Sequence, residues 1–259
     1  FVYEAGPCGF GIHRWLKAQG HECWVVSPSL TPKKPGERIK TDTRDAVKLA
    51  RLARAGELTA IYVPESADEA LRDLVRARED AVVMQRQARQ RLGALLLRND
   101  IRYNGKTLWS PAHRRFIAEL KLPHPAQHIA FEEYAQAVDE AGQRIERLEA
   151  AIGDELTRWR WRPVVEALQA LRGIRTIHAL RLVAELGDLT RFANPRHLMG
   201  FLGLVPSENS TGNRRRQGAI TKTGNSSARR ALVEAAWAYR YGARVSVGIA
   251  RRQSGLPKP

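Results

Sequence analysis

The stretch Lys40-Thr41-Asp42-Thr43-Arg44-Asp45-Ala46 opens a predicted helix and carries two carboxylates three residues apart. Residues at i and i+3 project from one face of a helix, so Asp42 and Asp45 can face a common ligand. Glu4, at the predicted end of an earlier strand, can supply a third carboxylate. Mg²⁺ prefers oxygen ligands, and two such ions about 3.5–4 Å apart can catalyse phosphodiester displacement. The pattern therefore predicts a magnesium site at Glu4, Asp42 and Asp45.

A structural interpretation of the same residues is equally open. Thr41 or Asp42 can cap the helix, while Asp45 stabilises the positive end of the helix dipole. Spacing alone favours neither interpretation. A complete metal site would also need a further acid, and the residues that precede Glu4 contain none.

The overall charge points to a polyanionic partner. The 259 residues include 43 Lys and Arg against 27 Asp and Glu, which gives a formal net charge of +16 and a pI near 10.6. Such an excess favours nucleic acid, with a merely soluble basic protein as the alternative. The sequence is 43% hydrophobic, enough for a core, but it has no long apolar run that would anchor it in a membrane. Cys8 and Cys23 lack zinc-ligand spacing, so we expect two reduced, packed thiols.

The first part of the chain alternates strand and helix signals, which is typical of an α/β domain. The expected elements are a buried strand ending at residues 1–4, a helix at 10–19 closed by Gly20, a strand at 23–27, a helix at 42–55 stopped by Gly56, and one more short strand at 61–63.

The middle of the chain predicts long helices. A charged helical stretch covers residues 67–98, and a loop-rich insert follows it. Seven apolar residues then recur at alternating spacings of three and four: Phe131, Tyr134, Val138, Ala141, Ile145, Leu148 and Ile152. This repeat is the a/d seam of a coiled coil. We expect an antiparallel hairpin, an oligomer seam or both, and the alternative is an amphipathic helix on a globular core.

Two further segments predict contacts with nucleic acid. Arg158-Trp159-Arg160-Trp161-Arg162 can grip phosphates and stack on bases, or it can be a helix end whose Trp rings pack inward. Residues 164–186 predict two short helices around a turn that contains Gly173 and Arg175, which is typical of a helix–hairpin–helix. The second helix of such a motif points free N–H groups at a phosphate, although a plain helix pair fits nearly as well.

The last part of the chain combines small hydroxyl residues with a dense cluster of cations. We expect an exposed loop to begin at Val205 and Pro206, and residues 206–212 contain Ser207, Ser210 and Thr211 beside Gly212. A serine there can attack phosphorus and hold the strand as a phosphoserine ester, or the segment can simply bind phosphate. We expect the helix that follows, at 226–239, to be capped by Ser226 or Ser227. Residues 213–252 hold one acid, Glu234, and these cations: Arg214, Arg215, Arg216, Lys222, Arg229, Arg230, Arg240, Arg244, Arg251 and Arg252.

Taken together, these stretches resemble the transposases of the insertion sequence 110 family. Residues 40–46 resemble the second half of that family's DEDD signature. Motifs in the family's order and spacing resemble its C-terminal transposase domain at residues 171–174, 191–192, 202–208, 210–212, 218–225 and 229–237.

The resemblance implies an α/β plus all-α architecture in three parts. These are a partial RNase H-like (RuvC-like) domain at 1–63, coiled-coil and linker helices at 64–162, and a C-terminal transposase domain with a helix–hairpin–helix at 163–259. It implies that Glu4, Asp42 and Asp45 hold Mg²⁺ and that Ser210 becomes joined to DNA, with Ser207 and Thr211 as the other candidates.

The implied partners are DNA, a structured non-coding guide RNA and further copies of the chain, as a dimer or tetramer joined through the coiled coil. No membrane partner is implied, and the expected location is the bacterial cytoplasm in association with the nucleoid. The implied reaction is metal-dependent strand cleavage and exchange. The alternatives are a RuvC-like structure-specific nuclease without a serine step, or a nucleic-acid-binding protein that is not an enzyme.

The sequence also departs from the family pattern. The first aspartate of the family is expected on a strand before Phe1, and relatives are expected to continue beyond Pro259. We therefore expect the parent protein to be a recombinase and this fragment, without a complete metal site, to be inactive.

Overall fold

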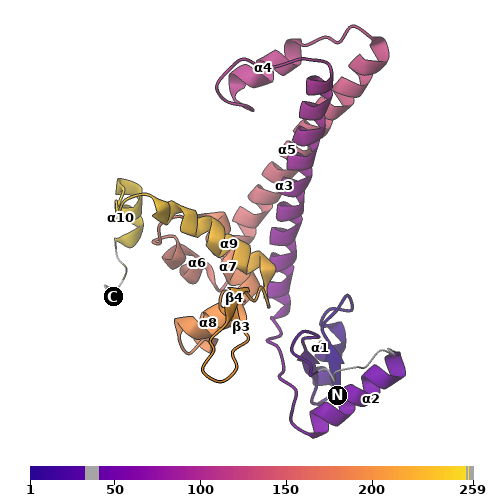
Figure 1. Ribbon diagram of the computed structural model, residues 1–259, viewed down its shortest axis with the longest axis vertical. Helices are drawn as coiled ribbons and strands as arrows, with labels where there is room; N and C mark the ends of the chain where they lie inside the picture. Colours follow the sequence, from indigo (N-terminus) through magenta and orange to yellow (C-terminus); the bar gives the residue numbers. More distant parts are fainter. Residues whose placement is uncertain (33–40, 255, 257–259) are drawn as a thin grey trace. The chain divides into compact units, whose positions relative to one another are not determined.

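The computed structural model describes residues 1–32, 41–254 and 256, and the described part is mostly helical with few strands (Figure 1). It forms two compact units, one of Phe1–Ser66 with Asp188–Arg230 and one of Ala67–Gly187 with Ala231–Pro259. The boundaries of these two units differ from those of the three expected domains. The division into three domains stays a prediction. Lys40 and part of the expected loop at 28–36 lie outside the described residues. Within the described ranges, no helix is long and apolar enough to cross a membrane.

The first unit begins with a small parallel sheet. Strand β1 (Val2–Glu4) pairs with β2 (Trp24–Val26), and α1 (Gly11–Ala18) connects them. β2 is the buried strand, since Val25 and Val26 are each 1% exposed. The expectation of a buried first strand is wrong, because β1 is only half-buried and Phe1 is 71% exposed.

Two smaller expectations in this region are also wrong. The residues expected to form a strand at 61–63 contribute only the Ile61 N–H, which donates to the Val25 carbonyl at 2.7 Å next to an isolated bridge between Val26 and Ala60. A single bridge does not continue as a strand, so the segment is irregular. Both cysteines are free, but only Cys23 is buried and Cys8 is exposed.

Helix α2 (Asp42–Arg54) packs against β1 and carries the two aspartates on its first turn. The hydroxyl of Thr41 caps the helix by accepting the Arg44 N–H at 3.3 Å. Leu49 is buried, whereas Val47, another apolar residue of the same helix, is 45% exposed, so the apolar residues of α2 do not all lie on its buried face.

The rest of the first unit contains short elements: the 3₁₀ helix η1 (Leu189–Arg191), helix α8 (Pro195–Phe201), strands β3 (Pro206–Glu208) and β4 (Gln217–Ile220), and the start of α9 (Ser226–Ala236). The expected cap of α9 at Ser226 or Ser227 is wrong. The side chain of Asn225 accepts the Ala228 N–H at 2.9 Å, which is the N-cap geometry.

The second unit is built on two long antiparallel helices, α3 (Ser66–Arg98) and α5 (Pro125–Arg158), which lie side by side in Figure 1. Three cross-helix contacts fix their direction: Asn99 with Gln127 at 3.0 Å, Met84 with Arg144 at 3.8 Å, and Arg78 with Glu149 at 2.6 Å. Residue numbers fall on one helix as they rise on the other, so the pair is antiparallel.

Apolar residues line the face between α3 and α5. A core cluster joins Leu92 and Leu95 of α3 to Phe131 and Val138 of α5. The seven residues of the expected a/d seam are all buried or half-buried. Coiled-coil packing along the pair stays a prediction. The insert between the two helices contains α4 (Pro111–Glu119), which its loop-rich sequence did not indicate.

The remaining helices of the second unit are α6 (Arg162–Leu168), α7 (Thr176–Leu186), the end of α9, the 3₁₀ helix η2 (Trp237–Arg240) and α10 (Val247–Gln253). Helix α7 is buried from Ala179 to Leu186, including two charged residues. Buried charges need partners, and both have them. Glu185 accepts from Arg76 at 2.8 Å, and Arg181 donates to Glu79 at 3.0 Å.

Asp68 organises the junction between α5 and α6. Its carboxylate is buried and accepts the indole N–H of Trp159 at 2.8 Å and that of Trp161 at 3.3 Å, and it pairs with Arg160. Trp159 is 8% exposed, so this ring packs inward, as the structural interpretation of the Arg-Trp repeat predicts.

We expect Asp68→Ala to lower the free energy of unfolding by about 3 kcal/mol, because it leaves a buried indole N–H and a guanidinium without their acceptor. Asp73→Ala, an exposed position on the same helix, is the matched control and should change stability by less than about 0.5 kcal/mol. Urea denaturation followed by Trp fluorescence measures both. Equal losses for the two variants would contradict the structural role of Asp68.

Candidate active site

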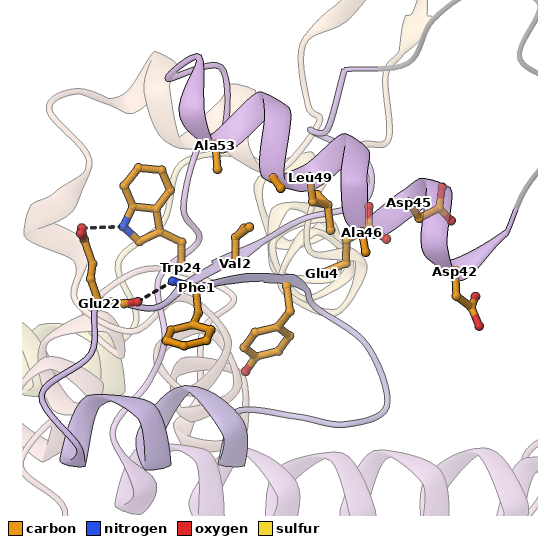
Figure 2. Close-up of a pocket in the computed structure, with 12 residues that line it drawn as sticks. Phe1, Val2, Glu4, Glu22, Trp24, Asp42, Asp45, Ala46, Leu49 and Ala53 are labelled. Carbon is orange, nitrogen blue, oxygen red and sulfur yellow. Dashed lines mark hydrogen bonds between the residues drawn. The ribbon is translucent and has the colours of Figure 1, made fainter.

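The three predicted metal ligands reach one pocket. Glu4 lies at the end of β1, Asp42 and Asp45 lie on the first turn of α2, and all three line a pocket of about 800 Å³ formed by β1, β2 and α2. Figure 2 shows them at the same end of this pocket, with Asp42 farthest from the strand. Because Thr41 caps the helix, Asp42 is not needed as the cap, while both aspartates lie in the first turn, where a negative charge also favours the positive end of the helix.

A fourth carboxylate of the pocket is placed differently. Glu22 accepts the indole N–H of Trp24 at 2.9 Å, and Figure 2 shows it at the end of the pocket opposite Asp42 and Asp45. Within residues 1–32, 41–254 and 256, no group of three or more His, Cys, Asp or Glu side chains is arranged to hold a metal ion. Glu4, Asp42 and Asp45 have the right donor atoms, but they do not form a closed coordination site here.

The segment predicted as a phosphoryl-transfer loop is a β-hairpin. Strands β3 and β4 pair antiparallel, with Pro206 opposite Ile220 and Glu208 opposite Gln217. Residues 209–216 continue the pairing, since Asn209 N–H donates to the Arg216 carbonyl at 2.9 Å. The hairpin is exposed along both strands. The sequence predicted only an exposed loop here, because an exposed two-stranded ribbon has no apolar alternation to reveal it.

The hydroxyl of Ser210 is exposed on this hairpin and makes two hydrogen bonds. It donates to Glu208 Oε1 at 2.8 Å and accepts the Arg216 N–H at 3.1 Å. The Gln217 side chain donates to Glu208 Oε2 at 3.2 Å. Hydrogen bonds from Ser210 and then from Gln217 lower the pKa of the Glu208 carboxyl. The sequence assigned no role to Glu208, although a carboxylate two residues before a serine on one strand face would have been a usable signal.

The other two hydroxyl candidates have different surroundings. A Cβ added at Gly218 would lie 2.6 Å from Ser207 Oγ, so the Ser207 side chain lies over the opposite strand. Thr211 forms the tight turn of the hairpin through two backbone hydrogen bonds with Arg214, each at 3.1 Å. Ser210 is thus the candidate that is exposed and bonded to a carboxylate.

Close backbone contacts hold the base of the hairpin against α8. A Cβ at Gly203 would lie 2.3 Å from Thr223 N, and one at Gly224 would lie 1.9 Å from the Phe201 carbonyl oxygen. The Arg229 guanidinium donates to the carbonyls of Leu202 and Thr223, each at 2.8 Å. Arg229, predicted to bind nucleic acid, therefore has a structural role at this junction.

The remaining predicted nucleic-acid contacts differ in their surroundings. Exposed cations are Arg158, Arg160, Arg162, Arg175, Arg214, Arg215, Arg216, Lys222 and Arg230. Arg158 pairs with Glu155 at 2.9 Å and Arg162 pairs with Glu166 at 2.7 Å. At Gly173 an added Cβ would lie 2.2 Å from the Ala235 carbonyl oxygen, so α9 closely approaches this turn. Binding of nucleic acid by these residues stays a prediction.

Comparison with known proteins identifies the family. A model of the Transposase IS116/IS110/IS902 family matches residues 165–246, and a model of the DEDD transposases of IS110 elements matches residues 3–99. These matches include the hairpin with Ser210 and the pocket with Glu4, Asp42 and Asp45. The chain belongs to the IS110 family of transposases, as the motif resemblance indicated.

Two relatives extend this match over nearly the whole chain. The candidate transposase y4qE of Sinorhizobium fredii is 48% identical over 245 residues, which cover 95% of this chain and 60% of that relative. The transposase for insertion sequence element IS1533 of Leptospira borgpetersenii is 30% identical over 258 residues, which cover 98% of this chain and 75% of that relative. The chain thus spans about three fifths of the first relative and three quarters of the second.

We expect Gly224→Ala to lower the free energy of unfolding by about 3 kcal/mol, because the residue has φ +70° and the new Cβ would overlap the Phe201 carbonyl. Gly200→Ala is the control, since its Cβ meets nothing within 4 Å and the site is helical, where alanine is favoured. Thermal unfolding followed by circular dichroism compares them. Equal melting temperatures for the two variants would contradict this expectation, because they would show that the segments at Gly224 and Phe201 can move apart without loss of stability.

Proposed function

We propose that this chain is the part of a DNA transposase that cuts and joins strands through a covalent serine–DNA intermediate. The observation that supports the proposal is the exposed Ser210 hydroxyl, held on a hairpin beside a run of cations. The family to which the chain belongs gives DNA as the substrate class. The structure-specific nuclease and the non-enzymatic binding protein remain alternatives that the experiments below separate.

The proposed chemistry uses serine as a nucleophile toward phosphorus. The Ser210 oxygen attacks a phosphodiester, a deoxyribose hydroxyl leaves, and the strand is held as a phosphoserine ester. A deoxyribose hydroxyl of another strand then attacks the same phosphorus and the serine leaves, so each step exchanges one phosphodiester linkage for another. Arg214, Arg215 and Lys222 are exposed on or next to the same hairpin. Their charge is available to stabilise the additional negative charge of the transition state.

We also propose that Glu4, Asp42 and Asp45 contribute carboxylates to a divalent metal site, with Mg²⁺ as the expected ion. Their oxygen donors and shared pocket support this, and their separation means that binding requires further ligands or a local rearrangement. A bound divalent ion would supply charge neutralisation at the reacting phosphate. The role of these three side chains is to hold the ion at the end of the pocket next to the first turn of α2.

The expected partners follow from the family resemblance and the charge. They are DNA, a structured non-coding guide RNA, and one or three further copies of the chain joined along α3 and α5. The net charge of +16 supports binding to nucleic acid. We also propose that α6 and α7 form a helix–hairpin–helix that binds nucleic acid. The proposed location is the bacterial cytoplasm, in association with the nucleoid.

Ser210→Ala should abolish the covalent adduct, because no oxygen remains to attack phosphorus. The complete gene product that contains this chain is incubated with end-labelled DNA, with its RNA and Mg²⁺, and adducts are resolved on denaturing gels. Ser207→Ala, on the same hairpin, is the matched control and should leave adduct formation within about twofold of the wild type.

The same experiment separates the alternatives. Strand cleavage that persists in Ser210→Ala without any adduct in the wild type would favour the nuclease. DNA binding without cleavage in the wild type would favour the binding protein.

The double substitution Asp42→Asn with Asp45→Asn should reduce strand cleavage by at least about 100-fold, because it removes two anionic ligands and keeps the size of both side chains. Asp154→Asn, an exposed residue of α5, serves as the control. Cleavage is measured against Mg²⁺ concentration, and melting temperature confirms that each variant is folded. Undiminished cleavage in the double variant would contradict a metal role for α2.

A further inference from the structure

We propose that Glu208 is the residue that accepts the proton of Ser210 and that Gln217 positions it. This inference rests on the proposed function, because it assigns a partner to the nucleophile named there. Neither Glu208 nor Gln217 was a candidate from the sequence.

The hydrogen bonds of Ser210 fix the direction of its proton. A hydroxyl has one hydrogen to donate and two lone pairs. The hydrogen is directed at Glu208 Oε1, 2.8 Å away, and one lone pair accepts the Arg216 N–H at 3.1 Å. The second lone pair is left for an incoming phosphorus. Nucleophile and base are therefore already within the distance that proton transfer requires.

The hairpin explains why Glu208 faces Ser210. Strand β3 ends at Glu208, but the antiparallel pairing continues beyond it, since the Asn209 N–H donates to the Arg216 carbonyl at 2.9 Å. Side chains two residues apart on such an extended segment project from the same face. Gln217 lies opposite Glu208 in the register of β3 and β4, and its amide donates to Glu208 Oε2 at 3.2 Å. One carboxylate oxygen is thus anchored across the hairpin while the other faces the nucleophile. A base oriented by a third group is the general arrangement of an activated serine.

The charges around Glu208 are compatible with this role. Arg215 Nε lies 3.9 Å from Glu208 Oε1 and is the charged group that faces it within the described hairpin. The Glu208 side chain is 47% exposed, so a phosphate can approach the pair and the accepted proton can leave to water. The hydrogen bonds from Ser210 and Gln217 lower the pKa of Glu208, so the carboxylate is ionised at neutral pH but is a weaker base than an unperturbed glutamate. Its role as proton acceptor therefore rests on its position next to the Ser210 hydroxyl.

A bond forms between Ser210 Oγ and phosphorus, and the Ser210 proton moves to the Glu208 carboxylate. The bond between phosphorus and one deoxyribose oxygen breaks, and that oxygen leaves with the electron pair and takes a proton from water. Glu208 then releases its proton to solvent, and the reverse sequence rejoins a strand and restores the serine.

Glu208→Gln tests the proposal, because the amide keeps the size and a hydrogen-bond acceptor but is a far weaker base. The rate of adduct formation by the complete gene product should fall at least about 100-fold. The pH profile separates a chemical role from a structural one. The wild-type rate should be flat near neutral pH, whereas the Glu208→Gln rate should rise about tenfold per pH unit, as the serine must then lose its proton to hydroxide.

Two further variants complete the experiment. Gln217→Ala should lower the rate of adduct formation to a value between those of the wild type and Glu208→Gln. It should keep the flat pH profile, because the base remains but is less well oriented. Glu119→Gln, at an exposed position of α4, should leave the rate unchanged.

The outcomes distinguish the two proposals. A wild-type adduct that persists in Ser210→Ala would overturn the proposed nucleophile and with it this inference. An adduct that is lost in Ser210→Ala but forms in Glu208→Gln at the wild-type rate would overturn only the role of Glu208. A slow Glu208→Gln variant with a flat pH profile would also overturn it, because the carboxylate would then act only by ordering the hairpin.

Discussion

The geometry of the candidate serine depends on how closely two backbone segments approach at the base of the hairpin. Gly203 and Gly224 have no side chain and positive φ angles, which allows the end of α8 to contact the segment that leads into α9. Arg229 then spans the junction with two hydrogen bonds to carbonyls. An isolated two-stranded ribbon is marginally stable in water. These contacts hold the base of the ribbon in place against α8. The positions of Ser210, Glu208 and Gln217 on the ribbon depend on them.

In the second unit, buried charges restrict how the helices can pack. Asp68 holds two indoles and a guanidinium, and α7 buries Arg181 and Glu185 against partners on α3. A buried charge without its partner is costly, so alternative packings of these helices are penalised more strongly than apolar contacts alone would require. The apolar seam between α3 and α5 brings the long helices together, and the ion pairs fix which faces meet.

Local patterns predicted the long helices and several of the short ones, but they did not predict α4 or α10. The threes-and-fours spacing from Phe131 to Ile152 and the threonine at position 41 indicated elements that the structure contains, because helix periodicity and capping are encoded within a few residues. The hairpin of β3 and β4 was not predicted, since both strands are short and exposed. The partners of Asp68 lie 91 to 93 positions away in the sequence, so no local pattern could reveal them.

The candidate site was predicted in part. Glu4, Asp42 and Asp45 were selected by residue type and spacing, and they do line one pocket. Their separation, however, depends on how α2 packs on β1, which the spacing does not encode. Glu208 was missed because the segment was expected to be a loop, so neither its shared face with Ser210 nor its position opposite Gln217 was evident.

The exposure of the hairpin has an evolutionary consequence. Its cations project into solvent and contribute nothing to a core, whereas the glycines and Arg229 at its base tolerate little change. Substitutions near the turn can therefore accumulate without unfolding the protein. Under the proposed function, preference for one nucleic acid sequence or shape would drift in this way among descendants of the same element, while Ser210, the proposed nucleophile, stays in place.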